Sequence, residues 1–273
     1  MKAKDLGILL TLMLIGEGIF FLPFVITRIF RPTFLTVFDI NNYQLGTAFS
    51  FYGIIAMFSY FLGGPIADRF APRQILPVAF IATSLAGFVM ASIPSVETLS
   101  ILYAFWGLTT ILMFWASYVK VQRAFGGEAS QGQSFGLVDA GRGFIAASTA
   151  SASIFLLDAL LPTPAEQASA TELTYALQWI IKVFAMGTML CAPLIWWVFR
   201  GDKYDNIQVE HLSLEGVKSV TGKPTVWIQA FIVLCAYVGY KVTDDFSLYA
   251  KVAFNYNDVE AAHMATVSFW VRP

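Results

Sequence analysis

Long apolar runs alternate with short polar breaks along this chain. A membrane-spanning helix needs about 20 mostly apolar residues. Seven runs are about that long: Leu6–Phe30, Gln44–Ala67, Gln74–Ser92, Leu99–Val119, Ser134–Leu161, Leu173–Phe199 and Val226–Leu248. An eighth run opens near Val259. Because the runs are continuous instead of alternating residue by residue, they favour helices over a membrane barrel. The pattern predicts an all-α, polytopic membrane protein.

The polar breaks also predict how the helices are grouped. Residues 1–199 hold six spans, residues 200–223 form the one long polar loop, and residues 224–273 start a second group with helix seven and part of helix eight. Six helices, a long loop and further helices are the layout of a transporter with two six-helix halves. Since the chain stops inside an apolar run at Trp270–Pro273, we expect it to be truncated.

Lysine and arginine are distributed unevenly between the two sides. With the N-terminus in the cytoplasm, the outer side holds only Arg28, Arg31 and Lys251. Basic residues prefer cytoplasmic loops, so this orientation is predicted. The first run has no small-residue cleavage site and is expected to stay as a helix. The inner side holds Lys2, Lys4, Arg69, Arg73, Lys120, Arg123, Arg200, Lys203, Lys218 and Lys223.

Composition supports the membrane interpretation. Apolar residues of the set AVILMFWYC make up 57% of the chain and charged residues 13%, whereas soluble domains average about 25% charged. A net charge of −1 argues against a nucleic-acid partner. Cys191 and Cys235 form no disulfide or metal pattern. With no nucleophile–base set or phosphate-binding glycine loop either, the sequence predicts neither an enzyme nor a cofactor, and we expect a monomer in the lipid bilayer.

One polar break contains a motif, between the second and third runs. It reads Gly63-Gly64-Pro65-Ile66-Ala67-Asp68-Arg69-Phe70-Ala71-Pro72-Arg73-Gln74. This resembles the major facilitator superfamily signature G-x-L-A-D-R-F-G-R-R/K, from which Ala71 and Pro72 depart. The resemblance implies a cytoplasmic gate of Gly64, Asp68, Arg69 and Arg73 that latches the two halves. A tight positive-inside turn is the alternative.

Two finer resemblances concern the branch of the superfamily. The Asp-Arg-x-x-Pro-Arg form followed by Ile-Leu-Pro is similar to the organophosphate/phosphate exchangers. Trp106–Thr110 and Gln131–Gly136 look like an uncharacterised bacterial subgroup. Residues 136–143 lack the proline that drug/proton antiporters have in helix five. Drug efflux is therefore the weaker alternative for this chain.

Ionisable residues inside the spans are candidate functional groups because they are costly in lipid. Glu17 lies near the middle of the first run and is a candidate for proton coupling. Arg28 follows eleven residues later, close to three helical turns, so the two would share a face of one straight helix. The resemblance implies an anion-binding arginine on helix one, for which Arg28 is the candidate. A snorkelling Arg28 beside Arg31 is the alternative.

Two further groups of charges stay open to two interpretations. Asp139 and Arg142 are neighbours at i,i+3. They are either a charge relay that lines the cavity and takes part in proton coupling, or a cytoplasmic gate pair with Lys120 or Arg123. We favour the gate pair. Lys241 takes the place at which the exchanger branch has an arginine on helix seven, or it pairs with Asp244 or Asp245.

The sequence therefore predicts secondary active transport of a small organic solute, with an anionic substrate and coupled protons as finer expectations. Tyr60 and Tyr240 join Arg28 and Lys241 as substrate-binding candidates, and no metal site is expected. The alternatives are a non-transporting membrane sensor, assembly protein or orphaned half-transporter, and drug/proton efflux.

Overall fold

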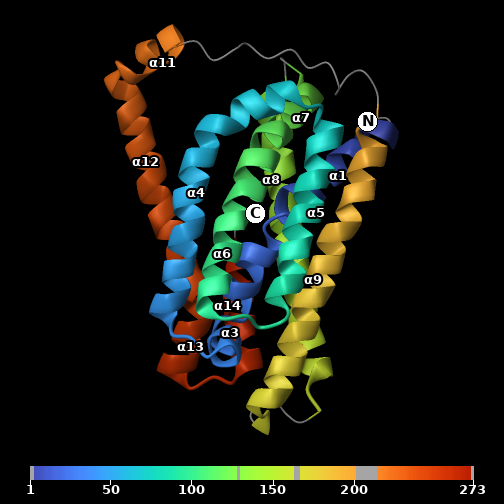
Figure 1. Cartoon of the computed structure of the whole chain (residues 1–273), viewed down its shortest axis with the longest axis vertical. Coiled ribbons are helices and arrows are strands. Elements are labelled where there is room, and N and C mark those ends of the chain that lie inside the picture. Colours follow the sequence, from blue (N-terminus) through green and yellow to red (C-terminus); the bar gives the residue numbers. More distant parts are fainter. Residues whose placement is uncertain (1–2, 128–129, 163–166, 201–213, 272–273) are drawn as a thin grey trace.

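The computed structural model describes residues 3–127, 130–162, 167–200 and 214–271, which form a bundle of long helices (Figure 1). Within these residues six helices are long and apolar enough to cross a membrane, or seven if the bent first pair is one span. The elements of the first six spans are α1 (Ala3–Gly18), the π-helix Phe21–Val25, α2 (Ile26–Ile29), α3 (Arg31–Phe38), α4 (Asn42–Arg69), α5 (Pro72–Met90), α6 (Val96–Gly107), the π-helix Leu108–Trp115, α7 (Ala116–Gly126), α8 (Gln131–Leu160) and α9 (Ala170–Val198).

The remaining elements surround the seventh span and the start of the eighth. They are α11 (Leu214–Thr221), α12 (Pro224–Lys241), the 3₁₀ turn Val242–Asp245, α13 (Phe246–Phe254) and α14 (Asp258–Trp270). The polar loop predicted at 200–223 thus contains a short helix, and residues 201–213 lie outside the described part. The all-helical prediction is confirmed, with boundaries that differ by a few residues.

Three helices start on capping boxes at the same end of the bundle, the lower end in Figure 1. Asn41 caps α4 and Ser169 caps α9, and each exchanges hydrogen bonds with the polar residue three positions later. Asn257 caps α14 in the same way. Because these residues satisfy the free backbone N–H groups of the first turn, the long helices begin sharply. We call this end, which includes α3 and α13, the α3 end.

The first span is broken, contrary to the straight helix assumed from the sequence. α1 and the segment Phe21–Ile29 meet at 43°. Pro23 explains the break, because a proline lacks the N–H that would bond four residues back and its ring clashes with that carbonyl, here of Ile19. The chain responds with a π-helical turn, in which Val25 N donates to Phe20 O at 3.3 Å. Arg28 therefore does not continue the helix that carries Glu17.

Two apolar clusters fill the first six spans. One lies around α2, α3 and the first half of α9, with Phe30, Phe34 and Trp106 fully buried. The other lies around α1 and α7, with Leu12 and Phe114 fully buried. Packing of this kind is what remains to hold helices together once lipid surrounds them.

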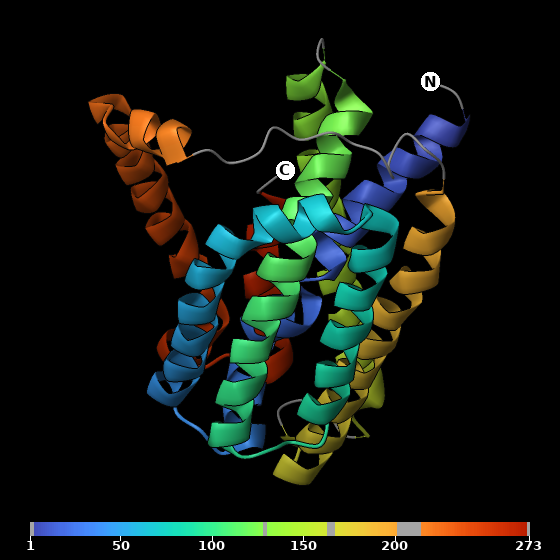
Figure 2. The same cartoon turned by 45° about the horizontal axis from the view of Figure 1, so that its top comes forward.

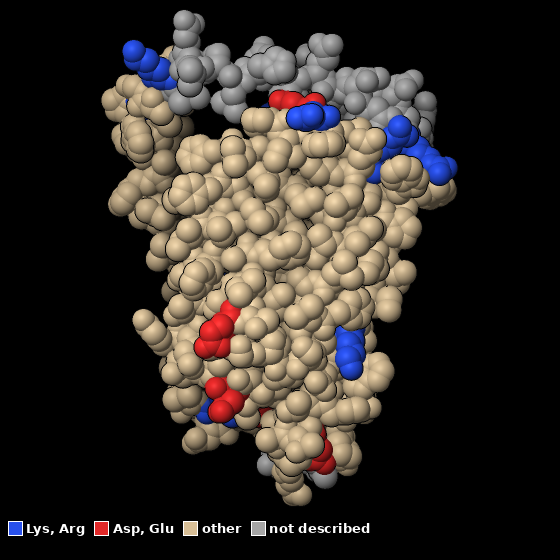
Figure 3. Space-filling model, viewed as in Figure 1, with Lys and Arg blue, Asp and Glu red and all other residues tan. Residues whose placement is uncertain are grey.

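The seventh span stands apart from this bundle over most of its length. None of the side chains of α12 is buried, and Figure 2 shows α12 splayed away from α4 at the end that carries α11. Contact is restored at the other end, where the 3₁₀ turn, α13 and α14 pack against α2 and α3. The face in Figure 3 shows a broad band with few charges between its two ends, as expected where hydrocarbon surrounds the helices.

Candidate functional site

A buried ion pair joins the first and seventh spans at the α3 end. Arg28 Nε donates to Asp244 Oδ1 at 2.5 Å, and Arg28 Nη1 donates to Tyr240 Oη at 2.5 Å. The side chains of Arg28 and Asp244 are 7% and 8% exposed. Such burial is incompatible with an arginine that snorkels, so that alternative for Arg28 is wrong. The helix-one candidate is instead an interior group with a partner from helix seven.

Lys241 binds the same carboxylate. Its Nζ contacts Asp244 Oδ2, the i,i+3 pairing that was one of the two interpretations of the sequence. It also lies over the rings of Phe24 and Phe49, at 5.2 and 5.6 Å from their centroids. One buried carboxylate is therefore shared by two cations, Arg28 and Lys241. The group has an excess of positive charge in a setting where charge is weakly screened.

Further polar contacts extend this junction. Arg31, also buried, donates to Asn42 Oδ1 at 2.8 Å and pairs with the half-exposed Asp245 at 3.1 Å. Asp258 accepts from Thr33 at 2.8 Å and pairs with Lys251 at 2.7 Å. These bonds tie α3 to the 3₁₀ turn and to α14. We call Arg28, Arg31, Tyr240, Lys241, Asp244, Asp245 and Asp258 the junction cluster.

A second charged group lies at the break in the first span. Arg142 Nη2 donates to Glu17 Oε2 at 3.3 Å, and Arg142 Nη1 donates to Asp139 Oδ1 at 2.9 Å. Glu17 is only 5% exposed, whereas the Asp139 side chain is 64% exposed. The gate pairing with Lys120 or Arg123 is not found, because Asp139 pairs with Arg142, which also pairs with Glu17 on α1, and Lys120 pairs with Asp68.

Gly16 lets this second group assemble. A Cβ placed on Gly16 would lie 2.3 Å from Tyr118 Oη and 2.8 Å from Arg142 Cδ. Any larger residue would push both side chains away from α1. Tyr118 is buried and donates to Leu12 O at 3.2 Å, so it is fixed against the same helix. The glycine beside Glu17 is thus part of the site.

The signature motif forms the turn between α4 and α5 at the opposite end. Pro72 opens α5, as expected for a proline in the first turn. Lys120 donates to Ala67 O at 3.1 Å and pairs with Asp68 at 3.5 Å, so Asp68 meets a lysine of α7. Arg73 lies over the ring of Trp196 at 5.9 Å. The close helix contact falls on the buried Gly63, where an added Cβ would lie 3.5 Å from Ile111 O, and not on the half-buried Gly64.

Apart from the motif residues at the turn between α4 and α5, the predicted site residues form two groups, and one residue stands alone. Arg28, Tyr240 and Lys241 come together in the junction cluster, and Glu17, Asp139 and Arg142 come together at the break. Tyr60 joins neither group, since it is 59% exposed on α4. Its neighbour two turns earlier, Tyr52, shares a hydrogen bond with Thr110 at 2.8 Å.

Sequence reasoning missed several partners in the junction cluster. It placed Asp244 and Asp245 only beside Lys241, and it did not single out Asp258, Thr33 or Asn42. A signal existed for Asp258, an acid that directly follows the helix cap Asn257, but nothing in the sequence pairs it with Thr33, 225 positions earlier.

Known proteins resemble this chain in sequence and in fold. It is 24% identical to the inner membrane protein YqcE of Escherichia coli (strain K12) over 232 residues, which are 83% of this chain and 52% of YqcE. It is 28% identical to the inner membrane protein YihN of the same organism over 134 residues, 49% of this chain and 32% of YihN. The chain therefore spans about half or less of the length of these relatives.

The fold matches that of a solved transporter. The crystal structure of a bacterial homologue of the human lysosomal transporter Spinster, in an inward-facing and unoccupied conformation, superposes with a TM-score of 0.64. The match covers 98% of this chain and 60% of that one, at 18% identity. The family described as the Major Facilitator Superfamily matches residues 6–271. This chain belongs to the Major Facilitator Superfamily.

Proposed function

We propose that this chain is part of a secondary active transporter that moves a small anionic organic solute across the membrane by alternating access. Its domains are then the first half (1–199), the cytoplasmic connection (200–223) and the start of the second half (224–273). The superfamily and the solved transporter with the same fold support transport over catalysis. The named relatives support a multi-pass protein of the inner membrane.

The observation on which the proposal rests is the sharing of Asp244 by Arg28 and Lys241. Two cations from different halves face one carboxylate, and a ligand with an anionic group would supply the missing negative charge. Arg28 and Asp244 are both less than a tenth exposed, so this attraction is stronger than it would be at a wet surface. The arrangement favours carboxylate, sulfonate or phosphate groups over neutral or cationic solutes.

The contrast between the two ends of α12 supports the alternating-access part of the proposal. Polar bonds close the α3 end, while α12 stands free of α4 at the end with the signature motif. With the N-terminus in the cytoplasm, as the basic residues Arg69, Arg73, Lys120 and Arg123 favour, the open end faces the cytoplasm.

Glu17 is our candidate for proton coupling, with Asp139 and Arg142 as its partners. The buried carboxylate of Glu17 and the exposed carboxylate of Asp139 compete for the same partner, Arg142. Protonation of Glu17 would release Arg142 to Asp139 and free the bent first span to move. Whether the transport is uptake or export depends on the substrate gradient.

A transport screen tests the proposal. The full-length protein would be reconstituted into proteoliposomes loaded with single organic anions, and counterflow of a labelled anion would be measured at fixed pH. We expect exchange of at least one anion, and an increase in KM of tenfold or more in Lys241→Gln, since each tenfold corresponds to about 1.4 kcal/mol. Lys251→Gln, which changes a lysine that pairs with Asp258 instead, is the matched control. Exchange of cations or neutral solutes only, or an unchanged KM in Lys241→Gln, would refute the anion site.

A further inference from the structure

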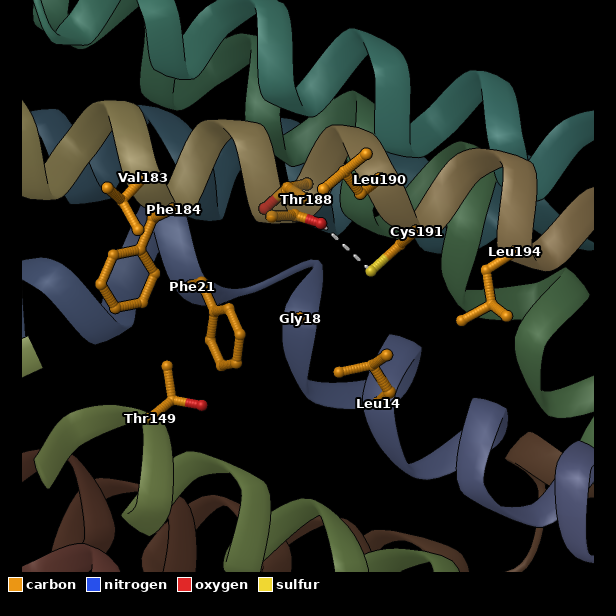
Figure 4. Close-up of a pocket in the computed structure, with 11 residues that line it drawn as sticks. Leu14, Gly18, Phe21, Thr149, Val183, Phe184, Thr188, Leu190, Cys191 and Leu194 are labelled. Atoms are coloured by element: carbon orange, nitrogen blue, oxygen red, sulfur yellow. Dashed lines mark hydrogen bonds between the residues drawn. The ribbon is translucent and has the colours of Figure 1, made fainter. Parts of the chain in front are cut away.

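An apolar cavity opens beside the break in the first span, and no described residue of either charged group lines it. Its volume is about 390 Å³, within the usual range for ligand pockets. Residues of α1 and the π-helix form one wall, α9 forms the second and Thr149 of α8 closes the third (Figure 4). The proposed transport mechanism uses none of these side chains.

The cavity has a buried floor and an exposed rim. Phe21, Phe184 and Cys191 on the floor are less than a tenth exposed, whereas Val183 and Leu190 on the rim are 49% and 62% exposed. The rim residues lie on the outward side of α9, so the cavity opens sideways through the bundle surface. A molecule can therefore enter from whatever surrounds α9.

The depth of the cavity determines what surrounds it. Thr188 lies about ten residues before the end of α9 at Val198, or about 15 Å along the helix. The hydrocarbon core of a bilayer is about 30 Å thick, so Thr188 is near its middle. No charged residue lines the cavity, and Cys191 donates to Gly187 O within its own helix. Lipid tails are the only molecules that are both abundant at that depth and apolar enough.

We propose that this cavity binds an acyl chain of a membrane lipid against the break in the first span. Its lining on α9 runs from Val183 to Leu194, a length of about 16 Å along the helix. The acyl chain would therefore lie along α9 instead of only touching it. The tail would fill the space beside Gly18 and Phe21, where the first span changes direction. This site is independent of the proposed anion site.

Gly187 offers a clean way to test the site. Gly187 lines the cavity and a Cβ added there meets no atom within 4 Å, so Gly187→Leu would extend a side chain from an unobstructed Cβ into the cavity. Leucine also favours a helix over glycine by close to 1 kcal/mol, and the variant should fold. Gly187→Ala makes the same backbone change with a single methyl group and serves as the matched control.

The experiment uses the full-length protein in phosphatidylethanolamine and phosphatidylglycerol vesicles that contain phosphatidylcholine with a photoreactive diazirine in mid-chain. After illumination, adducts are mapped by mass spectrometry. We expect adducts on the floor residues Phe21, Phe184 or Cys191 in the unmodified protein and in Gly187→Ala, and at least fivefold fewer in Gly187→Leu. Adducts on Val183 and Leu190 should persist in all three proteins, because these residues face bulk lipid. Adducts on the rim with none on the floor, or floor adducts that Gly187→Leu does not reduce, would overturn the proposal.

Discussion

Arg28 and Asp244 are 216 positions apart in the sequence, yet Arg28 Nε and Asp244 Oδ1 lie 2.5 Å apart with both side chains almost fully buried. This contact joins the first six helices to the seventh at one end only. Whatever moves the two parts relative to one another must break it.

Replacement of Asp244 by asparagine should destabilise the protein strongly. Arg28 would be left buried with no counter-charge, and breaking a buried pair costs about 3–5 kcal/mol. The partly exposed Lys241 would also lose its partner. Asp245→Asn is the control, because the Asp245 side chain is 50% exposed and Arg31 would keep its hydrogen bond to Asn42 Oδ1, so the loss should be smaller. Thermal unfolding in detergent measures both. Equal melting temperatures for the two variants would show that the Arg28 contact adds nothing special.

Glu17→Gln should uncouple transport from the proton gradient. The amide keeps the size of the side chain but neither takes up nor releases a proton during transport, while Arg142 keeps its ion pair with Asp139. We expect substrate counterflow to continue and pH-driven accumulation to stop. Accumulation in vesicles with an imposed pH gradient is the measurement, and Asp139→Asn should retain it at least in part. Full pH-driven accumulation in Glu17→Gln would end the coupling role.

Gly16→Ala should destabilise the first span, because the added methyl group would meet Tyr118 Oη and Arg142 Cδ. Overpacking of this kind costs about 1–3 kcal/mol. Tyr118→Phe removes the closest atom, so the double variant should recover part of the loss. Gly7→Ala on the same helix is the control, since a Cβ there meets nothing within 4 Å. Denaturation of the unmodified protein, the two single variants and the double variant measures the coupling energy between positions 16 and 118. Strictly additive changes in the free energy of unfolding would refute the contact.

The proposed orientation has its own test. Ser95 lies between α5 and α6 at the α3 end, and Gln133 lies in the first turn of α8 at the opposite end. Single cysteines at these positions should react with a membrane-impermeant maleimide from outside the cell at position 95 and only after permeabilisation at position 133. The reverse labelling would place the N-terminus outside.

The number of helices and their approximate limits follow from local pattern, and the structure confirms them. For instance, the third predicted run, Gln74–Ser92, is found as Pro72–Met90. The break in the first span also had a local signal, Pro23, which the apolar run obscured. By contrast, the π-helix Leu108–Trp115 has no proline or glycine within it. Its cause lies in packing that the one-dimensional pattern does not contain.

The candidate site was predicted as single residues and not as an arrangement. Burial cost in lipid is a property of each charge, so Glu17, Arg28 and Lys241 could be identified one by one. The choice of partner depends on tertiary contacts. Because of them Arg142 meets Glu17, Lys120 meets Asp68 instead of Asp139, and Arg28 meets Asp244.

Alternating access requires the α3 end to open and close, and a disulfide can hold it closed. Asn42 Nδ2 and Asp245 Oδ1 lie 3.4 Å apart across the junction. The test uses Asn42→Cys and Asp245→Cys, alone and together, in a background with Cys191→Ala and Cys235→Ser, since both native cysteines are free. Counterflow is measured after oxidation and again after reduction, with disulfide formation checked by mass spectrometry. We predict that the oxidised double variant stops transporting and recovers on reduction, while the single variants transport throughout. Full transport by the verified cross-linked protein would contradict the account.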